Sequence, residues 1–129
     1  MSWWGRYIGL PFGEGPGEVT CWGLVRRVYA NHLGVDLPEY GEISARDLVR
    51  IARAMGRGKD DGWRAVEQPQ PFDVCLMRGS SGAAVVVHVG VVTLPGFILH
   101  VEAASAAVVV PVGGFSVAGR IMGYRRLAA

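Results

Sequence analysis

Three side chains along the sequence could together form an activated cysteine nucleophile. Cys21 stands at the start of an expected helix, where free backbone N–H groups and the positive end of the helix dipole favour a thiolate. The same N–H groups, including that of Cys21, could bind the oxyanion formed when the thiolate attacks a carbonyl. His88 and His100 lie in two apolar segments further on, and a cysteine with a base and an orienting third group is the general form of such a site.

Each of these residues also has a purely structural interpretation. A free cysteine is more often buried and inert than catalytic, and a lone histidine in an apolar strand is more often a hydrogen-bonded core residue. Zinc is the other competitor, but the spacings from Cys21 to His88 and on to His100 match no zinc pattern, so we predict no metal site. Cys75, in the segment PFDVC, is expected to be a buried strand residue, and Asp73 a turn or strand-end residue.

The elements that must position these side chains follow from the spacing of the apolar residues. Thr20 as N-cap, helical spacing after it and Gly34 as a stop predict a helix from Cys21 to Leu33. A second helix is expected to start after Ser44 and to end near the glycines at 56–58. In the second half, β-branched runs broken by Gly and Pro predict strands at Val74–Arg78, Ala84–Val92, Phe97–Glu102, Ala107–Val112 and Arg120–Arg125.

Composition limits the class of protein. The 129 residues suit a single domain, 1–129, and with 50% hydrophobic and 19% charged residues the chain can build a core. Helices first and strands afterwards predict an α+β domain, with N-terminal helices packed on one face of a mostly antiparallel sheet. A net charge of +2 argues against a nucleic-acid partner, and the least polar segment is shorter than a membrane span. We see no secretory signal and expect synthesis in the cytoplasm.

The segments LPFGEGPGEVTCWGLVRRVY, PFDVCLM, HVGVV and FILHVEA together resemble the NlpC family of papain-like bacterial cell-wall cysteine peptidases. In that family a Cys-x-Gly-hydrophobic-Val motif opens a helix, and a Gly-Asp strand, a His-hydrophobic-Gly strand and a second His follow. The resemblance implies a papain-like fold, no cofactor, and cleavage of amide bonds in peptidoglycan stem peptides. It implies Cys21 as the nucleophile, His88 as the general base and His100 as the residue that orients the imidazole of His88.

Finer features suggest a particular branch of that family. Trp22, after the cysteine, resembles the short members encoded among phage-tail and gene-transfer-agent genes. This likeness implies a particle component that binds tail or baseplate proteins and acts in the periplasm of the recipient cell. Thr20 and Phe12 replace a common Asp and a Tyr near the oxyanion site; Tyr7 is another candidate for the missing hydroxyl, and Phe12 and Trp22 are expected beside the substrate. The alternative is a catalytically weak or inactive structural adaptor in a tail assembly.

Two further features could serve contacts with partners. On the expected second helix, four arginines recur at steps of three or four residues and would lie on one face: Arg46, Arg50, Arg53 and Arg57. This face is either simply solvated or a docking surface for an acidic partner. Trp3 and Trp4 either anchor the chain to a neighbour or pack on its own core.

Overall fold

The computed structural model describes residues 2–37, 63–79, 86–103 and 105–127. Within them lie a short 3-10 helix, one α-helix and six strands: η1 (Trp3–Tyr7), α1 (Cys21–Leu33), β1 (Trp63–Val66), β2 (Val74–Arg78), β3 (Val86–Leu94), β4 (Phe97–His100), β5 (Val108–Pro111) and β6 (Ile121–Leu127). The expected second helix, with its four arginines, lies outside the described residues.

Helix α1 begins and ends at the predicted residues because its two caps form as expected. Thr20 is in an extended conformation, and its Oγ1 accepts a hydrogen bond from the backbone N–H of Gly23 at 3.0 Å. At the other end Gly34 takes a left-handed conformation with φ of 65°, which glycine adopts without steric cost. The caps therefore fix Cys21 as the first residue of the helix.

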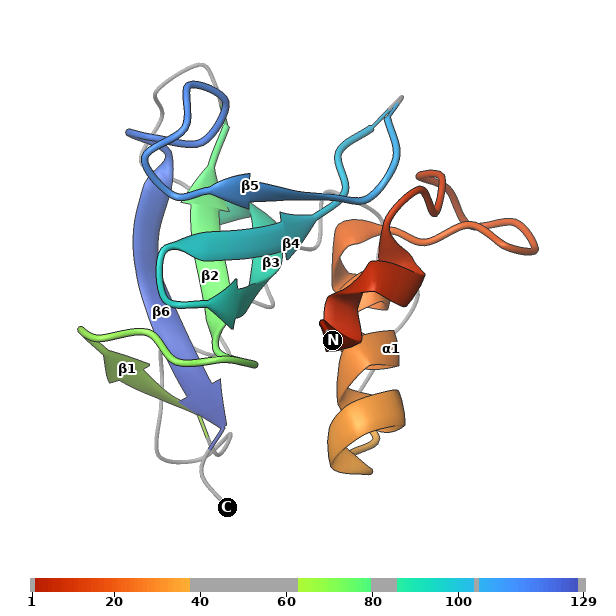
Figure 1. Cartoon of the computed structure of the whole chain (residues 1–129), viewed down its shortest axis with the longest axis horizontal. Helices are drawn as coiled ribbons and strands as arrows, with labels where there is room; N and C mark the ends of the chain where they lie inside the picture. Colours follow the sequence, from red (N-terminus) through yellow and green to blue (C-terminus); the bar gives the residue numbers. More distant parts are fainter. Residues whose placement is uncertain (1, 38–62, 80–85, 104, 128–129) are drawn as a thin grey trace.

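The six described strands form one antiparallel sheet in the order β1-β6-β2-β3-β4-β5 (Figure 1). Strand β2 has the predicted bounds, and β3 to β6 overlap the other four predicted ranges. Strand β1 was not predicted; it pairs with β6, with Trp63 opposite Leu127. The sheet is thus the mostly antiparallel one expected.

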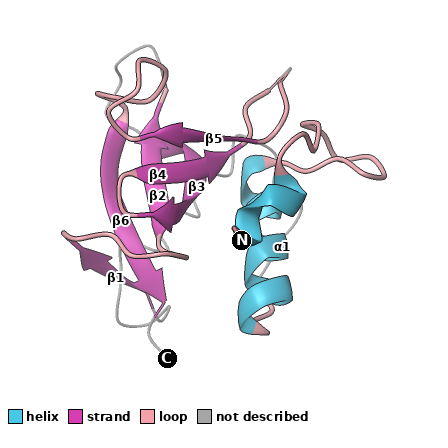
Figure 2. Ribbon diagram, viewed as in Figure 1, coloured by secondary structure: helices cyan, strands magenta, loops and turns pink. Residues whose placement is uncertain are grey.

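Helix α1 lies along one side of the sheet, as Figure 2 shows, and contacts β3. Its apolar residues Leu24, Val25 and Val28 are buried in one cluster with residues of the sheet such as Val89 and Leu99. Burial of these side chains supplies most of the energy that holds the helix in place. The α+β arrangement predicted from the order of the elements is confirmed.

A second, smaller core lies among residues that alternate with those under α1. Cys75 and Met77 of β2 pack with Val92, Ile98 and Val117, whereas Leu76 between them belongs to the cluster under the helix. Cys75 is fully buried, as predicted. Both cysteines are free, and they belong to different clusters.

The N-terminal tryptophans and Asp73 have structural roles. Trp3 stacks on Phe72 with ring centroids 4.6 Å apart, and both tryptophans are partly buried against the main core, so they pack on this chain. Asp73 accepts a hydrogen bond from the backbone of Gln70 and a forked one from Arg126, which confirms it as a turn residue. No helix in the described part of the chain is long and apolar enough to cross a membrane.

Candidate active site

Two buried imidazoles meet at the C-terminal end of β4, of which His100 is the last residue. His88 Nε2 and His100 Nδ1 are 2.8 Å apart, within hydrogen-bond distance, and the side chains are only 6% and 4% exposed. One of these nitrogens must carry the shared proton and the other accept it. If His88 Nε2 donates, Nδ1 of His88 is left with the lone pair that a general base needs. The structure thus brings together the two histidines that the sequence singled out.

The register of β3 and β4 creates this contact, and Gly90 makes room for it. Val91 pairs with Leu99, which sets His100 beside Gly90, two residues along from His88. A Cβ at Gly90 would lie 3.0 Å from the carbonyl oxygen of Leu99 and 3.1 Å from Cβ of His100. The absence of a side chain at Gly90 therefore lets His100 approach β3.

Cys21 lies beside the same stretch of β3. Backbone groups of Val89, Trp22 and Cys21 itself are within hydrogen-bonding range of the thiol, so the first residue of α1 adjoins the residue that follows His88. Within the described residues no hydrogen bond joins the thiol to either imidazole. The arrangement places the thiol and the imidazole pair on neighbouring segments.

The electrostatics of Cys21 differ from the expectation of an activated thiolate. The residue is only 6% exposed, and this burial raises the pKa of the Cys21 thiol to about 11, although the nearby backbone groups lower it. The backbone groups at the helix N-terminus lower the pKa of the thiol, as the sequence predicts, but desolvation is the larger effect. At rest Cys21 is a buried, neutral thiol, which corrects the expectation of a thiolate at the helix N-terminus.

The imidazoles are neutral as well. Burial lowers the pKa of His88 to about 4, helped by the neighbouring His100. Burial also lowers the pKa of His100, against the opposing effect of the Glu102 carboxylate. The resting site therefore contains an uncharged thiol and two uncharged imidazoles at neutral pH.

Two charged residues that the sequence argument missed complete the surroundings. Glu102 Oε1 lies 3.7 Å from His100 Nδ1, and Arg120 Nη1 donates to the same oxygen at 2.6 Å. The sequence signal for Glu102 was its place two residues after His100, but nothing in the sequence pairs it with Arg120. Both residues line a cavity of about 350 Å³ that also reaches His100.

The same cluster is the described group most able to hold a metal ion. One ligand atom each from His88, His100 and Glu102 lies within 4.8 Å of the others, although their spacing in the sequence matches no metal motif. Oε1 of Glu102 already accepts a hydrogen bond from Arg120 Nη1, so a metal ion would have to displace that donor to bind this oxygen. Imidazole bonding and proton exchange are the chemistry that the arrangement favours.

The residues expected beside the substrate lie close to the start of α1. Phe12 forms a bridge with Val19, and its N–H donates to the carbonyl of Ser105. Trp22 is buried in the main core, so contact between it and a substrate stays a prediction. Tyr7 does not supply the missing hydroxyl, because its oxygen bonds His32, about 16 Å along the helix from Cys21.

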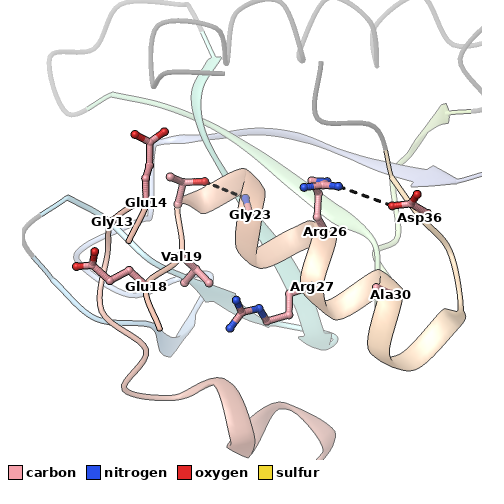
Figure 3. Close-up of a pocket in the computed structure, with 10 residues that line it drawn as sticks. Gly13, Glu14, Glu18, Val19, Gly23, Arg26, Arg27, Ala30 and Asp36 are labelled. Atoms are coloured by element: carbon pink, nitrogen blue, oxygen red, sulfur yellow. Dashed lines mark hydrogen bonds and ion pairs between the residues drawn. The ribbon is translucent and has the colours of Figure 1, made fainter. Parts of the chain in front are cut away.

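A cavity of about 440 Å³ lies beside the first turns of α1 (Figure 3). Its lining includes Thr20 and Gly23, together with acidic Glu14 and Glu18 and basic Arg27, whose side chain points back along the helix towards Val19. Such a lining suits a polar ligand that carries both charges, for example a peptide with free carboxylates and amines. Because Thr20 precedes Cys21, the cavity is next to the segment that carries the thiol.

No protein-family profile matches the sequence, and no curated protein matches it. Several solved structures, however, are similar to this one. A protein from Staphylococcus aureus subsp. aureus Mu50, described as similar to a lipoprotein of the NLP/P60 family, has a TM-score of 0.64 and 20% identity over 96% of this chain and 38% of its own. An NlpC/P60 family protein from Bacillus cereus ATCC 10987 has a TM-score of 0.69 and 22% identity over 95% and 37%.

A third similar structure is the NlpC/p60 domain of the peptidoglycan hydrolase SagA, with a TM-score of 0.57 and 22% identity over 96% of this chain and 91% of that domain. The chain therefore spans 38% and 37% of the first two proteins and nearly all of this one. At such identities the likeness concerns the fold. The chain folds as an α+β, papain-like domain of the NlpC/P60 type.

Proposed function

We propose that this protein is a cysteine peptidase that hydrolyses amide bonds in the stem peptides of peptidoglycan. The observation that carries the proposal is the hydrogen bond between His88 Nε2 and His100 Nδ1, next to the strand residue whose backbone adjoins the Cys21 thiol. The fold supports the substrate class, because one solved neighbour is a domain of a peptidoglycan hydrolase.

In the proposed mechanism Cys21 attacks the amide carbonyl while its thiol proton moves to Nδ1 of His88. A C–S bond forms, the carbonyl π electrons move to oxygen, and backbone N–H groups at the start of α1, including that of Cys21, stabilise the oxyanion. His88 then gives the proton to the leaving nitrogen as the C–N bond breaks, and a thioester remains. Water, deprotonated by His88, hydrolyses the thioester and restores the thiol.

The neutral resting state determines the timing of the first step. With the pKa of Cys21 about 11 and that of His88 about 4, a preformed thiolate and imidazolium pair is unfavourable. Proton transfer therefore accompanies the attack and does not precede it. The role of His100 is to hold the ring of His88 through Nε2, so that Nδ1 is the nitrogen without a proton.

The same electrostatics favour a second candidate, a catalytically weak or inactive adaptor that uses the peptidase fold. A cysteine this buried, with a raised pKa, has the properties of an inert core thiol. In that case His88 and His100 would be a hydrogen-bonded pair that satisfies its own buried polar atoms. The two candidates differ in whether the chain has hydrolytic activity that depends on Cys21.

Digestion of purified peptidoglycan, followed by mass spectrometry of the released fragments, separates the candidates. We expect new amine and carboxyl ends from the wild type and none from Cys21→Ala. The matched control is Cys75→Ala, which removes the other buried thiol and leaves the imidazole pair intact. Equal product from all three proteins, or none from the wild type, would favour the adaptor.

Delivery is a finer part of the proposal. The segment CWGLV is similar to the short phage-tail and gene-transfer-agent members, so we propose that the protein is carried in such a particle and acts on the recipient's wall. Detection of the chain in purified tail particles by mass spectrometry would support this. A protein found only free in the producing cell would contradict it.

A further inference from the structure

Next to the imidazole pair lies a charged pair that the proposed mechanism does not use. The carboxylate of Glu102 is 3.7 Å from His100 Nδ1, too long for a hydrogen bond but close for a charge. Arg120 Nη1 donates to this carboxylate at 2.6 Å. A carboxylate and a guanidinium, joined by a hydrogen bond, therefore lie beside the two imidazoles.

Hydrogen bonds to backbone carbonyls hold the guanidinium of Arg120, and this guanidinium in turn holds the carboxylate of Glu102. Its Nε donates to the carbonyl of Arg78 at 2.9 Å, and its Nη1 also donates to the carbonyl of Ser116 at 3.2 Å. The backbone N–H of Arg78 in turn donates to the carbonyl of Arg120 at 2.8 Å. The guanidinium is therefore attached to the end of β2 and to the loop before β6, and Glu102 has little freedom to leave the imidazoles.

On the basis of the proposed function, we infer that Glu102, held by Arg120, is a positioning residue for the imidazole pair. Its carboxylate stabilises the positive charge that His88 gains when it takes the proton of the thiol. Glu102 does not touch the substrate or the thiol in this inference. It acts on the imidazole pair, because its carboxylate and one ring nitrogen of each histidine all lie within 4.8 Å of one another.

The charges around His88 act in opposite directions. Burial and His100 lower its pKa, the Glu102 carboxylate raises it, and the Arg120 guanidinium lowers it. Among the described residues, three titratable or charged groups act on His88: His100 at the end of β4, Glu102 after it and Arg120 before β6. The thiol of Cys21 on α1 lies by the backbone of Val89, the residue after His88. Arg78 of β2 directs its guanidinium to the carbonyl of Gly119.

Two substitutions that each remove one charge separate the effects of the two charges. Glu102→Gln removes the negative charge, and we expect His88 to titrate about one pH unit lower than in the wild type. Arg120→Gln removes the positive charge, and we expect His88 to titrate higher than in the wild type. Glu102→Asp keeps the charge and should restore most of the wild-type value.

Nuclear magnetic resonance of the imidazole C–H groups measures these midpoints directly, since the chain has only three histidines. The third histidine, His32, lies in the last turn of α1 and is bonded to the hydroxyl of Tyr7, so its signals are assigned separately from those of the pair. Circular dichroism of each variant confirms that it is folded over the titrated range. Midpoints that do not move, or that move in the same direction in Glu102→Gln and Arg120→Gln, would overturn the inference.

The titration needs no activity, so its result is separate from that of the proposed function. A wild type without hydrolytic activity would contradict the function, while opposite shifts in the two variants would still establish the control of His88 by this pair. In an active enzyme we expect Glu102→Gln to lower kcat about tenfold with little change in KM, because one pH unit corresponds to a factor of ten in imidazolium stability. The acid limb of the kcat/KM profile should move with the midpoint of His88, whereas damage to folding would lower activity without moving it.

Discussion

The reactivity of Cys21 depends on the balance between two effects at one sulfur atom. The helix N-terminus and nearby backbone groups favour the thiolate, but removal from water disfavours it more strongly. A thiol in this balance is protected from oxidation at rest, since only the thiolate reacts readily. In the proposed mechanism, activation then requires the proton acceptor on His88, so the reactivity of the cysteine would depend on the imidazole pair.

Alkylation by iodoacetamide at a series of pH values tests this balance. We expect the rate at Cys21 to rise with a midpoint near pH 11, because burial raises the pKa of the thiol to about 11. Peptide mapping assigns the label, and Cys21→Ser gives the background from Cys75, whose pKa burial raises to about 12. A midpoint near ~8.5 would mean that burial does not perturb the thiol, and a midpoint well below that value would mean that the thiol is activated in the free protein.

At the scale of the elements, the register of β3 against β4 creates the imidazole pair. The register is set by the pairing of Val91 with Leu99, and the approach of the two strands at His100 depends on the empty position at Gly90. A change at this one position should therefore affect the site without altering any polar group.

Gly90→Ala tests that dependence. The new methyl would lie 3.0 Å from the carbonyl oxygen of Leu99 in β4. We therefore expect the free energy of unfolding to fall by roughly 1 to 3 kcal/mol, the usual cost of overpacking a core. We also expect the signals of His88 and His100 to shift in a histidine NMR spectrum. Gly113→Ala is the control, because a Cβ there meets nothing within 4 Å. Equal stability and unchanged imidazole signals in both variants would contradict this role of Gly90.

The elements with strong local signals could be predicted from the sequence. Helix α1 was predicted residue for residue because Thr20 and Gly34 cap it through contacts within a few positions. Strand β1 was missed because only Trp63 of its four residues is buried, which leaves no alternating pattern to detect.

The candidate site could be predicted only in part, for a physical reason. The types of Cys21, His88 and His100 are visible in the sequence, but the hydrogen bond between the two histidines depends on the register of β3 against β4, which the sequence does not fix. The Glu102 to Arg120 contact joins residues from the end of β4 and the start of β6, so no local pattern announces it. Burial of the thiol is likewise a property of the packed fold, and it reversed the predicted direction of the pKa shift of Cys21.

At the scale of the whole molecule, the site places uncharged imidazoles inside the folded protein. Unfolding exposes them to water, where histidine has a pKa of about 6.5. Between pH 6.5 and the lower pKa values that His88 and His100 have in the folded protein, the unfolded chain therefore binds more protons than the folded one. Acid consequently shifts the equilibrium of the entire domain towards unfolding.

The free energy of unfolding should fall as the pH decreases from 6.5 to 4, and His88 is expected to contribute about 3 kcal/mol of that loss. The sign follows from burial, which lowers the folded-state pKa of His88 to about 4, so its stabilising contribution is complete above pH 6.5 and lost below pH 4. Urea unfolding at several pH values measures the slope. In His88→Gln the slope over this range should become shallower than in the wild type, whatever the stability of the variant at neutral pH. Equal slopes in the wild type and His88→Gln would mean that His88 is already charged, or exposed to water, in the folded protein.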